Sequence, residues 1–124
     1  MKRAPSLTGS ALVALLAMTL AGCGPTRPAP GIQGDPARGK IALTQYACHS
    51  CHMVPSVAGS SVYVGRPLED MAERRYIAGK VPNTQDNLVR WIIDPQAIDP
   101  GSAMPAMGVS ERDAIDISAY LLSQ

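Results

Sequence analysis

Two cysteines and a histidine stand close together in the stretch "ACHSCHMVP", residues 47–55. Cys48 and Cys51 are three positions apart, and His52 follows directly. Thiol and imidazole groups at this spacing can bind a zinc ion, exchange a disulfide, form a structural disulfide or attach a c-type haem. The rest of the chain distinguishes between these chemistries.

Zinc prefers four ligands, usually with a second pair elsewhere in the chain, whereas the candidate thiols and imidazoles here are crowded into residues 48–52. A thioredoxin-like redox pair is expected in a strand–helix context within a βαβ pattern, and the sequence shows no such pattern. A structural disulfide would leave His52 unexplained. The spacing C-x-x-C-H is the attachment signature for haem, because the two cysteines reach one porphyrin edge and the next residue can bind the iron. We therefore predict one haem c, bound covalently through Cys48 and Cys51, with His52 as an iron ligand and His49 as an exposed spacer.

The N-terminus reads as an export signal. Lys2 and Arg3 precede an apolar run over residues 11–20, which is too short to cross a bilayer. The run ends in "LAGC", which resembles the lipobox of bacterial lipoproteins and implies acylation of Cys23; an ordinary signal peptide with a coincidental cysteine is the alternative. An exported chain on the periplasmic side of a bacterial membrane, anchored by lipid, is the expectation, and that compartment suits haem c.

Three segments follow from this reading. Residues 1–22 are a lipoprotein signal peptide, residues 23–34 a lipidated tether rich in Pro and Gly, and residues 35–124 one folded domain. Without Lys2 and Arg3, nine basic residues face 10 acidic ones. The chain has no excess of basic residues that would indicate binding to nucleic acid or to an anionic membrane surface. Contact with the membrane is therefore expected through the lipid on Cys23.

Helices are expected at both ends of the domain. Asp35 is a plausible N-cap with Pro36 at the first helical position, and Ser110 caps a last helix with Asp113 completing a weak capping box. The last helix has an apolar stripe at helical spacing. The two helices are expected to cross at small residues, Gly39 and Ala119.

Between them, two shorter helices are expected at about residues 68–76 and 84–93, with Arg74 and Arg75 solvated. Residues 94–108 are rich in Pro and Gly and predict an ordered loop without helix. No alternating strand pattern is visible, so the fold class is predicted to be all-α. Aromatic residues make up 4% of the chain and Phe is absent, so a haem would supply apolar mass that the core lacks.

Several patterns together resemble the small bacterial class I (monohaem) cytochromes c of lipoprotein type. They are the first helix leading into C-x-x-C-H, "NTxxNLxxWIxxPQxxxPGxxMPxxG" over residues 83–108, and the closing "DAIDISAYL". The resemblance covers residues 34–122 and implies about four helices packed around one covalently bound haem. It also implies His52 and Met104 as the two axial ligands. Prolines on both sides of Met104 favour it over Met107 as the ligand.

The resemblance further implies a hydrogen bond that orients the ligand histidine. Relatives commonly have Gly-Pro after the haem turn, and the backbone carbonyl of the residue after this Gly holds the imidazole. Here "VGRPL" places Arg66 after Gly65, so Arg66 would provide the carbonyl. Such a bond fixes the tautomer of the imidazole and its basicity.

An iron with His and Met ligands is coordinatively closed and passes single electrons without bond-making chemistry. The predicted function is therefore a membrane-anchored electron carrier, not an enzyme, that exchanges electrons with a terminal oxidase or a quinol-oxidising complex. A haem subunit of a periplasmic dehydrogenase is one alternative. A haem peroxidase or gas sensor with a displaceable Met is another, although no third histidine exists to serve it.

Overall fold

The computed structural model describes residues 29–124, so the predicted signal peptide and Cys23 lie outside the described residues. Within that part, the chain forms four α-helices, two short 3-10 helices and two short strands. Their order is α2 (Pro36–Gln45), η2 (Cys48–Ser50), η3 (Met71–Glu73), β1 (Tyr76–Ile77), β2 (Val81–Pro82), α3 (Gln85–Ile93), α4 (Pro95–Ile98) and α5 (Glu111–Leu121).

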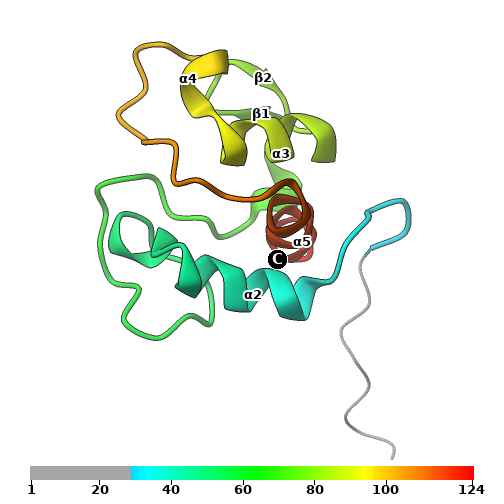
Figure 1. Ribbon diagram of the computed structural model, residues 1–124. Helices are drawn as coiled ribbons and strands as arrows, with labels where there is room; N and C mark the ends of the chain where they lie inside the picture. Colours follow the sequence, from blue (N-terminus) through cyan, green and yellow to red (C-terminus); the bar gives the residue numbers. More distant parts are fainter. Residues whose placement is uncertain (1–28) are drawn as a thin grey trace, which may run out of the picture.

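Helix α5 is the central element of the fold. It packs against α2 on one side and α3 on the other, and Figure 1 shows it nearly end-on between them. Its buried stripe includes Ala114, Ile117 and Leu121, which join Leu43 of α2 and Leu88 of α3 in one apolar core. The apolar periodicity of the sequence therefore identified the contact face of this helix correctly.

Side chains cap the first turns of α2 and α3, and the cap of α2 is the one that the sequence predicts. The Asp35 carboxylate accepts hydrogen bonds from the backbone N–H groups of Ala37 and Arg38, and Pro36 occupies the first turn of α2. Thr84 caps α3 in the same way. These caps satisfy N–H groups that have no partner inside the helix.

The crossing of α2 and α5 depends on Gly39. A Cβ atom at this position would lie 2.0 Å from the backbone oxygen of Asp116 and 2.9 Å from the nitrogen of Ile117. The expected close approach at Gly39 is thus confirmed. Its nearest neighbours on α5 are Asp116 and Ile117 rather than Ala119, which is nevertheless fully buried.

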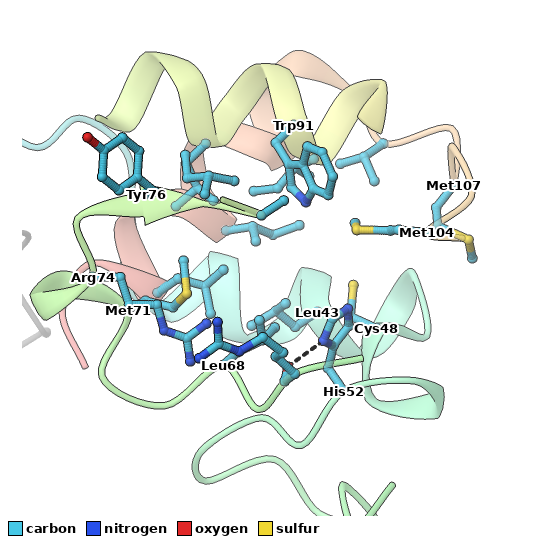
Figure 2. A pocket seen from close by; sticks show the side chains of 18 of the residues that line it. Leu43, Cys48, His52, Leu68, Met71, Arg74, Tyr76, Trp91, Met104 and Met107 are labelled. Atoms are coloured by element: carbon cyan, nitrogen blue, oxygen red, sulfur yellow. Dashed lines mark hydrogen bonds between the residues drawn. The ribbon is translucent and has the colours of Figure 1, made fainter. Parts of the chain in front are cut away.

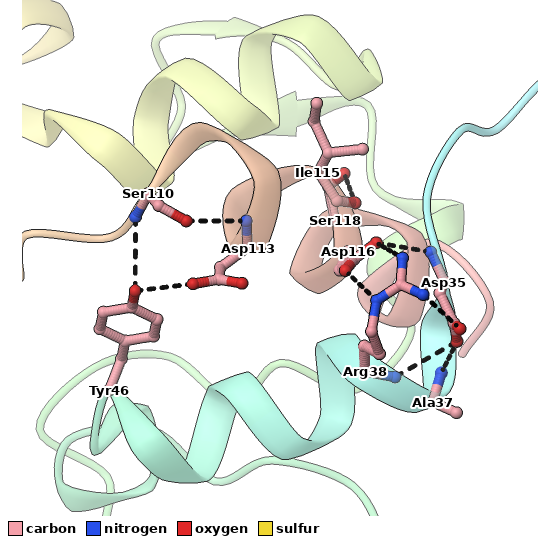
Figure 3. A network of polar contacts seen from close by, with 9 residues as sticks. All are labelled: Asp35, Ala37, Arg38, Tyr46, Ser110, Asp113, Ile115, Asp116 and Ser118. Carbon is pink, nitrogen blue, oxygen red and sulfur yellow. Dashed lines mark hydrogen bonds and ion pairs between the residues drawn. The ribbon is translucent and has the colours of Figure 1, made fainter.

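A polar network fastens the beginning of α2 to α5 (Figure 3). Asp116 is 2% exposed, and its carboxylate accepts bonds from Arg38 Nε at 2.7 Å, from Arg38 Nη2 at 3.0 Å and from the backbone N–H of Asp35 at 2.7 Å. Burial alone would raise the pKa of Asp116, but the bonds from Arg38 and Asp35 outweigh it and hold this pKa below its usual value. The carboxylate is therefore charged and fully partnered near neutral pH.

The predicted capping box at the start of α5 includes a third residue. The Asp113 backbone N–H donates to Ser110 Oγ at 3.1 Å, as expected for an N-cap. The Asp113 carboxylate, however, accepts from the Tyr46 hydroxyl at 2.8 Å, and this hydroxyl accepts from the Ser110 N–H at 3.4 Å (Figure 3). Tyr46 thereby joins the end of α2 to the beginning of α5.

The prediction of an all-α fold is wrong. Strands β1 and β2 form a small antiparallel sheet in which Tyr76 pairs with Pro82 and Ile77 pairs with Val81. The helix expected over residues 68–76 is reduced to η3, because Asp70 has a left-handed φ of 53° and the chain is extended at Arg74. The Arg74 guanidinium donates to the carbonyls of Pro67 and Glu69, so this segment folds around a side chain.

The segment over residues 94–108 also differs from its prediction, because it contains the short helix α4. Asp94 accepts a hydrogen bond from the backbone N–H of Ala97 at 3.2 Å, and Pro95 occupies the first position. Proline is well suited to that position, so the Asp-Pro pair that directly follows α3 begins another helix.

Candidate functional site

The C-x-x-C-H segment is shaped by a reversal of the chain after α2. Ala47 has a left-handed φ of 53°, which is unusual for a residue other than glycine, and the 3-10 turn η2 begins after it. The backbone N–H groups of Cys51 and His52 both donate to the carbonyl of Cys48, at 3.3 Å and 3.0 Å. Cys48, Cys51 and His52 are therefore held in one tight turn.

Both cysteines are free thiols in the structure, so the structural-disulfide reading is not supported. Burial raises the pKa of the Cys48 thiol, and the neighbouring Cys51 raises it slightly further.

His52 is fixed by the segment that contains Gly65 and Arg66. Its Nδ1 atom lies 2.7 Å from the backbone oxygen of Arg66, which accepts the ring proton (Figure 2). The Gly65 N–H donates to the carbonyl of Cys51 at 2.7 Å and brings the chain flat against the imidazole. A Cβ atom at Gly65 would lie 2.2 Å from His52 Cε1, so only glycine fits. The expected contact with the Arg66 carbonyl is confirmed, and it leaves Nε2 as the free nitrogen.

His52 opens onto a cavity of about 390 Å³ between α2, α3 and α5. Most of its wall is apolar, and Figure 2 shows the Trp91 indole on the side opposite His52. Cys48, His52 and Met104 all line it. A second cavity, of about 280 Å³, is lined by the same three residues and also by Cys51. The four predicted cofactor-binding residues therefore meet at one place in the fold.

The loop that carries Met104 is held by a residue whose role the sequence analysis missed. The Gln96 side chain of α4 donates to the backbone oxygen of Met104 at 2.5 Å and to that of Ser102 at 3.3 Å. The Met104 N–H donates to Ser102 Oγ at 3.2 Å. Met107 also lines the cavity but is 43% exposed. Gln96 is a polar residue in a proline-rich segment, and the neighbouring sequence gives no indication that its side chain holds the backbone of the Met104 loop.

Two arginines lie at the cavity wall, Arg66 and Arg74. Arg74 is half-buried rather than solvated, which corrects the expectation for this residue. Burial lowers the pKa of Arg74, and the neighbouring Arg66 lowers it further. The lining of this cavity contains no carboxylate, so its charged part is cationic.

Comparison with known proteins points to respiratory oxidases. No family model matches the chain, and no solved structure matches it. The chain is 36% identical to cytochrome c oxidase subunit 2 of Alkalihalophilus pseudofirmus over 87 residues, which is 69% of this chain and 25% of the relative. It is 28% identical to cytochrome c oxidase subunit 2 of Bacillus sp. (strain PS3) over 98 residues, 76% of this chain and 28% of the relative. The chain thus spans about a quarter of the length of these relatives.

These relatives support the expected connection with respiratory electron transfer and with a terminal oxidase, and they correct three finer expectations. Both are named as subunit 2 of an oxidase and not as a class I monohaem cytochrome c, so we withdraw the assignment to a small cytochrome c fold. The prediction of one covalent haem c is corrected for the same reason. In addition, within residues 29–124 no group of three or more His, Cys, Asp or Glu residues is placed to hold a metal ion. The expectation that the chain is an electron carrier and not an enzyme is also overturned, because both relatives are subunits of an oxidase, which is an enzyme complex.

None of the helices described for residues 29–124 is long and apolar enough to span a membrane.

Proposed function

We propose that residues 35–124 are a one-electron transfer module that works with a membrane-bound terminal oxidase. Two observations support this proposal. The relatives are subunits of cytochrome c oxidase, and the donor groups of His52, Met104, Cys48 and Cys51 converge on one apolar cavity. The orientation of His52 by Arg66 carries the argument, because it frees one nitrogen toward that cavity.

We propose that His52 and Met104 are ligands of a redox-active metal and that Cys48 and Cys51 are further cofactor-binding residues. Imidazole and thioether groups suit redox-active transition metals, so His52 and Met104 fit such a centre as a pair of ligands. When bound, this centre would supply a site that gains and loses one electron.

The protein's own residues would make such a transfer efficient. The Arg66 carbonyl and the close backbone of Gly65 hold the imidazole in one orientation and one tautomer. Gln96 holds the backbone at Met104 in the same way on the other ligand loop. Donors that do not move when the charge changes require little reorganisation, and the apolar wall keeps water away from them.

Attachment to the membrane is the second part of the proposal. The "LAGC" stretch supports removal of residues 1–22 and lipidation of Cys23, with residues 23–34 as the tether. Confinement to the membrane surface on the periplasmic side raises the effective concentration of the module near a membrane-bound oxidase. Replacement of Cys23 by Ser should release the protein from the membrane fraction without changing its metal content.

The full chain, purified from the membranes of an exporting host, allows a direct test. Metal analysis identifies the bound element, and a potentiometric titration measures the number of electrons. His52→Ala should lose the bound metal and the one-electron transition. His49→Ala is the matched control, because His49 lies three residues earlier and lines neither cavity.

A protein with no stoichiometric metal, or a His52→Ala variant that keeps both the metal and the transition, would contradict the proposed site. A metal-loaded protein that cannot be oxidised by the oxidase of its own organism would contradict the proposed partner.

A further inference from the structure

We infer that Asp99 is a positioning residue for Met104, because it folds residues 99–104 into one hydrogen-bonded unit that carries this side chain. The inference rests on the proposed function, in which Met104 is a ligand, and adds the residue that determines where its sulfur lies. Asp99 itself lines neither cavity. Its effect on the proposed centre would therefore be transmitted by the loop.

Asp99 fixes the beginning of this loop with both its backbone and its side chain. Its backbone N–H donates to the carbonyl of Pro95 at 2.9 Å and closes the turn of α4. Its Oδ1 atom accepts from the backbone N–H of Gly101 at 3.2 Å, and its carbonyl oxygen accepts from the N–H of Ser102 at 2.9 Å. One residue thus determines the path of the chain as far as Ser102.

Ser102 continues the unit to Met104. Its Oγ atom accepts from the backbone N–H of Met104 at 3.2 Å. The Gln96 side chain donates to the carbonyls of Met104 and Ser102, at 2.5 Å and 3.3 Å. Both backbone polar groups of Met104 are therefore bound, so only the side-chain torsions remain to place the sulfur. Figure 2 shows the Met104 side chain pointing toward the space between Trp91 and His52.

Lys80 is the charged partner of the Asp99 carboxylate. Its Nζ atom lies 3.5 Å from Asp99 Oδ1, and the two side chains are 51% and 25% exposed. The backbone N–H of Lys80 donates to the carbonyl of Ile77 at 2.9 Å, and Ile77 lines the larger cavity. An ion pair as exposed as this one contributes little by itself. The hydrogen bond from Gly101, and not the charge of Asp99, is therefore the contact that positions the loop.

A loop that is ordered before the metal binds makes the weak bond to a thioether easier to keep. Otherwise the loop residues would have to be ordered when that bond forms, at a cost in conformational entropy. Loss of the Asp99 carboxylate should thus let Met104 leave the metal, most readily in the oxidised state, because a thioether favours the reduced metal.

The test compares Asp99→Ala with the unchanged full chain, each purified with its bound metal. The reduction potential of Asp99→Ala should fall toward that of Met104→Ala, and the affinity of the oxidised protein for added imidazole should rise by about tenfold or more. Hydrogen exchange in the peptide that contains residues 99–104, measured by mass spectrometry, should become faster. Metal content should not change, because His52 keeps its own orienting bond.

Asp99→Asn is the conservative variant, because it keeps a side-chain oxygen for the Gly101 N–H and loses only the charge. Its affinity for imidazole should stay within about fivefold of that of the unchanged protein, the limit set by an exposed ion pair. Asp86→Ala is the matched control, since it removes the same charge from an exposed position of α3 that lines neither cavity, and it should change nothing. Ser102→Ala removes the acceptor for the Met104 N–H and should reproduce the effect of Asp99→Ala.

An unchanged potential and imidazole affinity in Asp99→Ala would overturn the inference, even with faster hydrogen exchange, because the loop would then not determine the position of Met104. Equal shifts in Asp86→Ala or Asp99→Asn would overturn it as well, since the effect would then come from charge and not from the hydrogen bond. A full chain without stoichiometric metal would instead contradict the proposed function. In that case, equal hydrogen exchange in Asp99→Ala and the unchanged chain would overturn the inference too, whereas faster exchange would support the role of Asp99 in holding the Met104 backbone.

Discussion

The imidazole of His52 and the backbone carbonyl of Arg66 are joined by a 2.7 Å hydrogen bond, 14 residues apart in sequence. The bond assigns the proton to Nδ1 and leaves Nε2 as the nitrogen that is available to the proposed metal. Gly65 makes the contact possible because its backbone lies against the ring where any side chain would collide.

Gly65→Ala should therefore disturb the site more than the fold. The added Cβ atom would lie within 2.7 Å of three ring atoms of His52, so the imidazole must rotate or the Arg66 carbonyl must withdraw. Loss of such an orienting contact typically lowers metal affinity about 10- to 100-fold. Competition with a chelator measures this affinity. Gly101→Ala is the control, because its Cβ atom would meet only Asp99 Oδ1 at 3.6 Å; equal affinities in the two variants would contradict the role of Gly65.

Met104→Ala and Met107→Ala should differ in the reduction potential. A thioether ligand favours the reduced metal, so loss of Met104 should lower the potential and open a coordination position to small exogenous ligands. Met107 is 43% exposed, and its truncation should cost less than about 1 kcal/mol of folding free energy without lowering the potential. Potentiometric titration of both variants provides the comparison. The opposite order of potentials would transfer the ligand role to Met107.

Gly39→Ala should destabilise the domain strongly. Its Cβ atom would lie 2.0 Å from the backbone oxygen of Asp116, and neither helix can yield locally because both contacts involve backbone. Overpacking of this kind typically costs about 1–3 kcal/mol, and backbone contacts on both helices place Gly39→Ala at the upper end of that range. Urea unfolding followed by circular dichroism measures the change. Lys40→Ala, at the next position of the same helix, should stay within about 0.5 kcal/mol of the unchanged protein.

The stability of the domain should fall in acid through Asp116. Its pKa in the folded state lies below the usual value of 3.8, so the charged form stabilises the fold above that pH. This contribution is lost as the pH falls below about 4 and through the lower folded-state pKa. Asp116→Asn should be less stable at pH 7 and should show a smaller loss of stability between about pH 4 and pH 2. An equal acid dependence in both proteins would show that Asp116 does not contribute.

Local chemistry was the most predictable part of the fold. The caps at Asp35 and Ser110 depend on residues within one helical turn, and the close crossing at Gly39 depends on a missing side chain, so the sequence indicated all of them. Segments whose shape depends on distant or non-repeating contacts were predicted incorrectly. The helix expected over residues 68–76 is replaced because the Arg74 guanidinium binds two carbonyls of its own loop.

In the candidate site, too, features that depend on local sequence were predicted and features that depend on distant contacts were not. Spacing alone brought attention to Cys48, Cys51 and His52, and the structure places Met104 at the same cavity. The clamp formed by Gln96 depends on how α4 folds back on the loop after it, which no short pattern specifies. The motif alone did not identify the group that these residues would bind, because the relatives are subunits of cytochrome c oxidase and do not support a covalent haem c.

The first residues of the described chain are fastened before α2 begins. Gln33 exchanges two hydrogen bonds with the Gln85 side chain, at 2.9 Å and 2.6 Å, and the Asp35 N–H binds Asp116. A force applied to the chain before Gln33 is therefore transmitted to α3 and α5 through these hydrogen bonds. The turn that holds Cys48, Cys51 and His52 lies beyond the opposite end of α2. A pull on the chain before α2 would thus strain this fastening first and leave the geometry of Cys48, Cys51 and His52 unchanged.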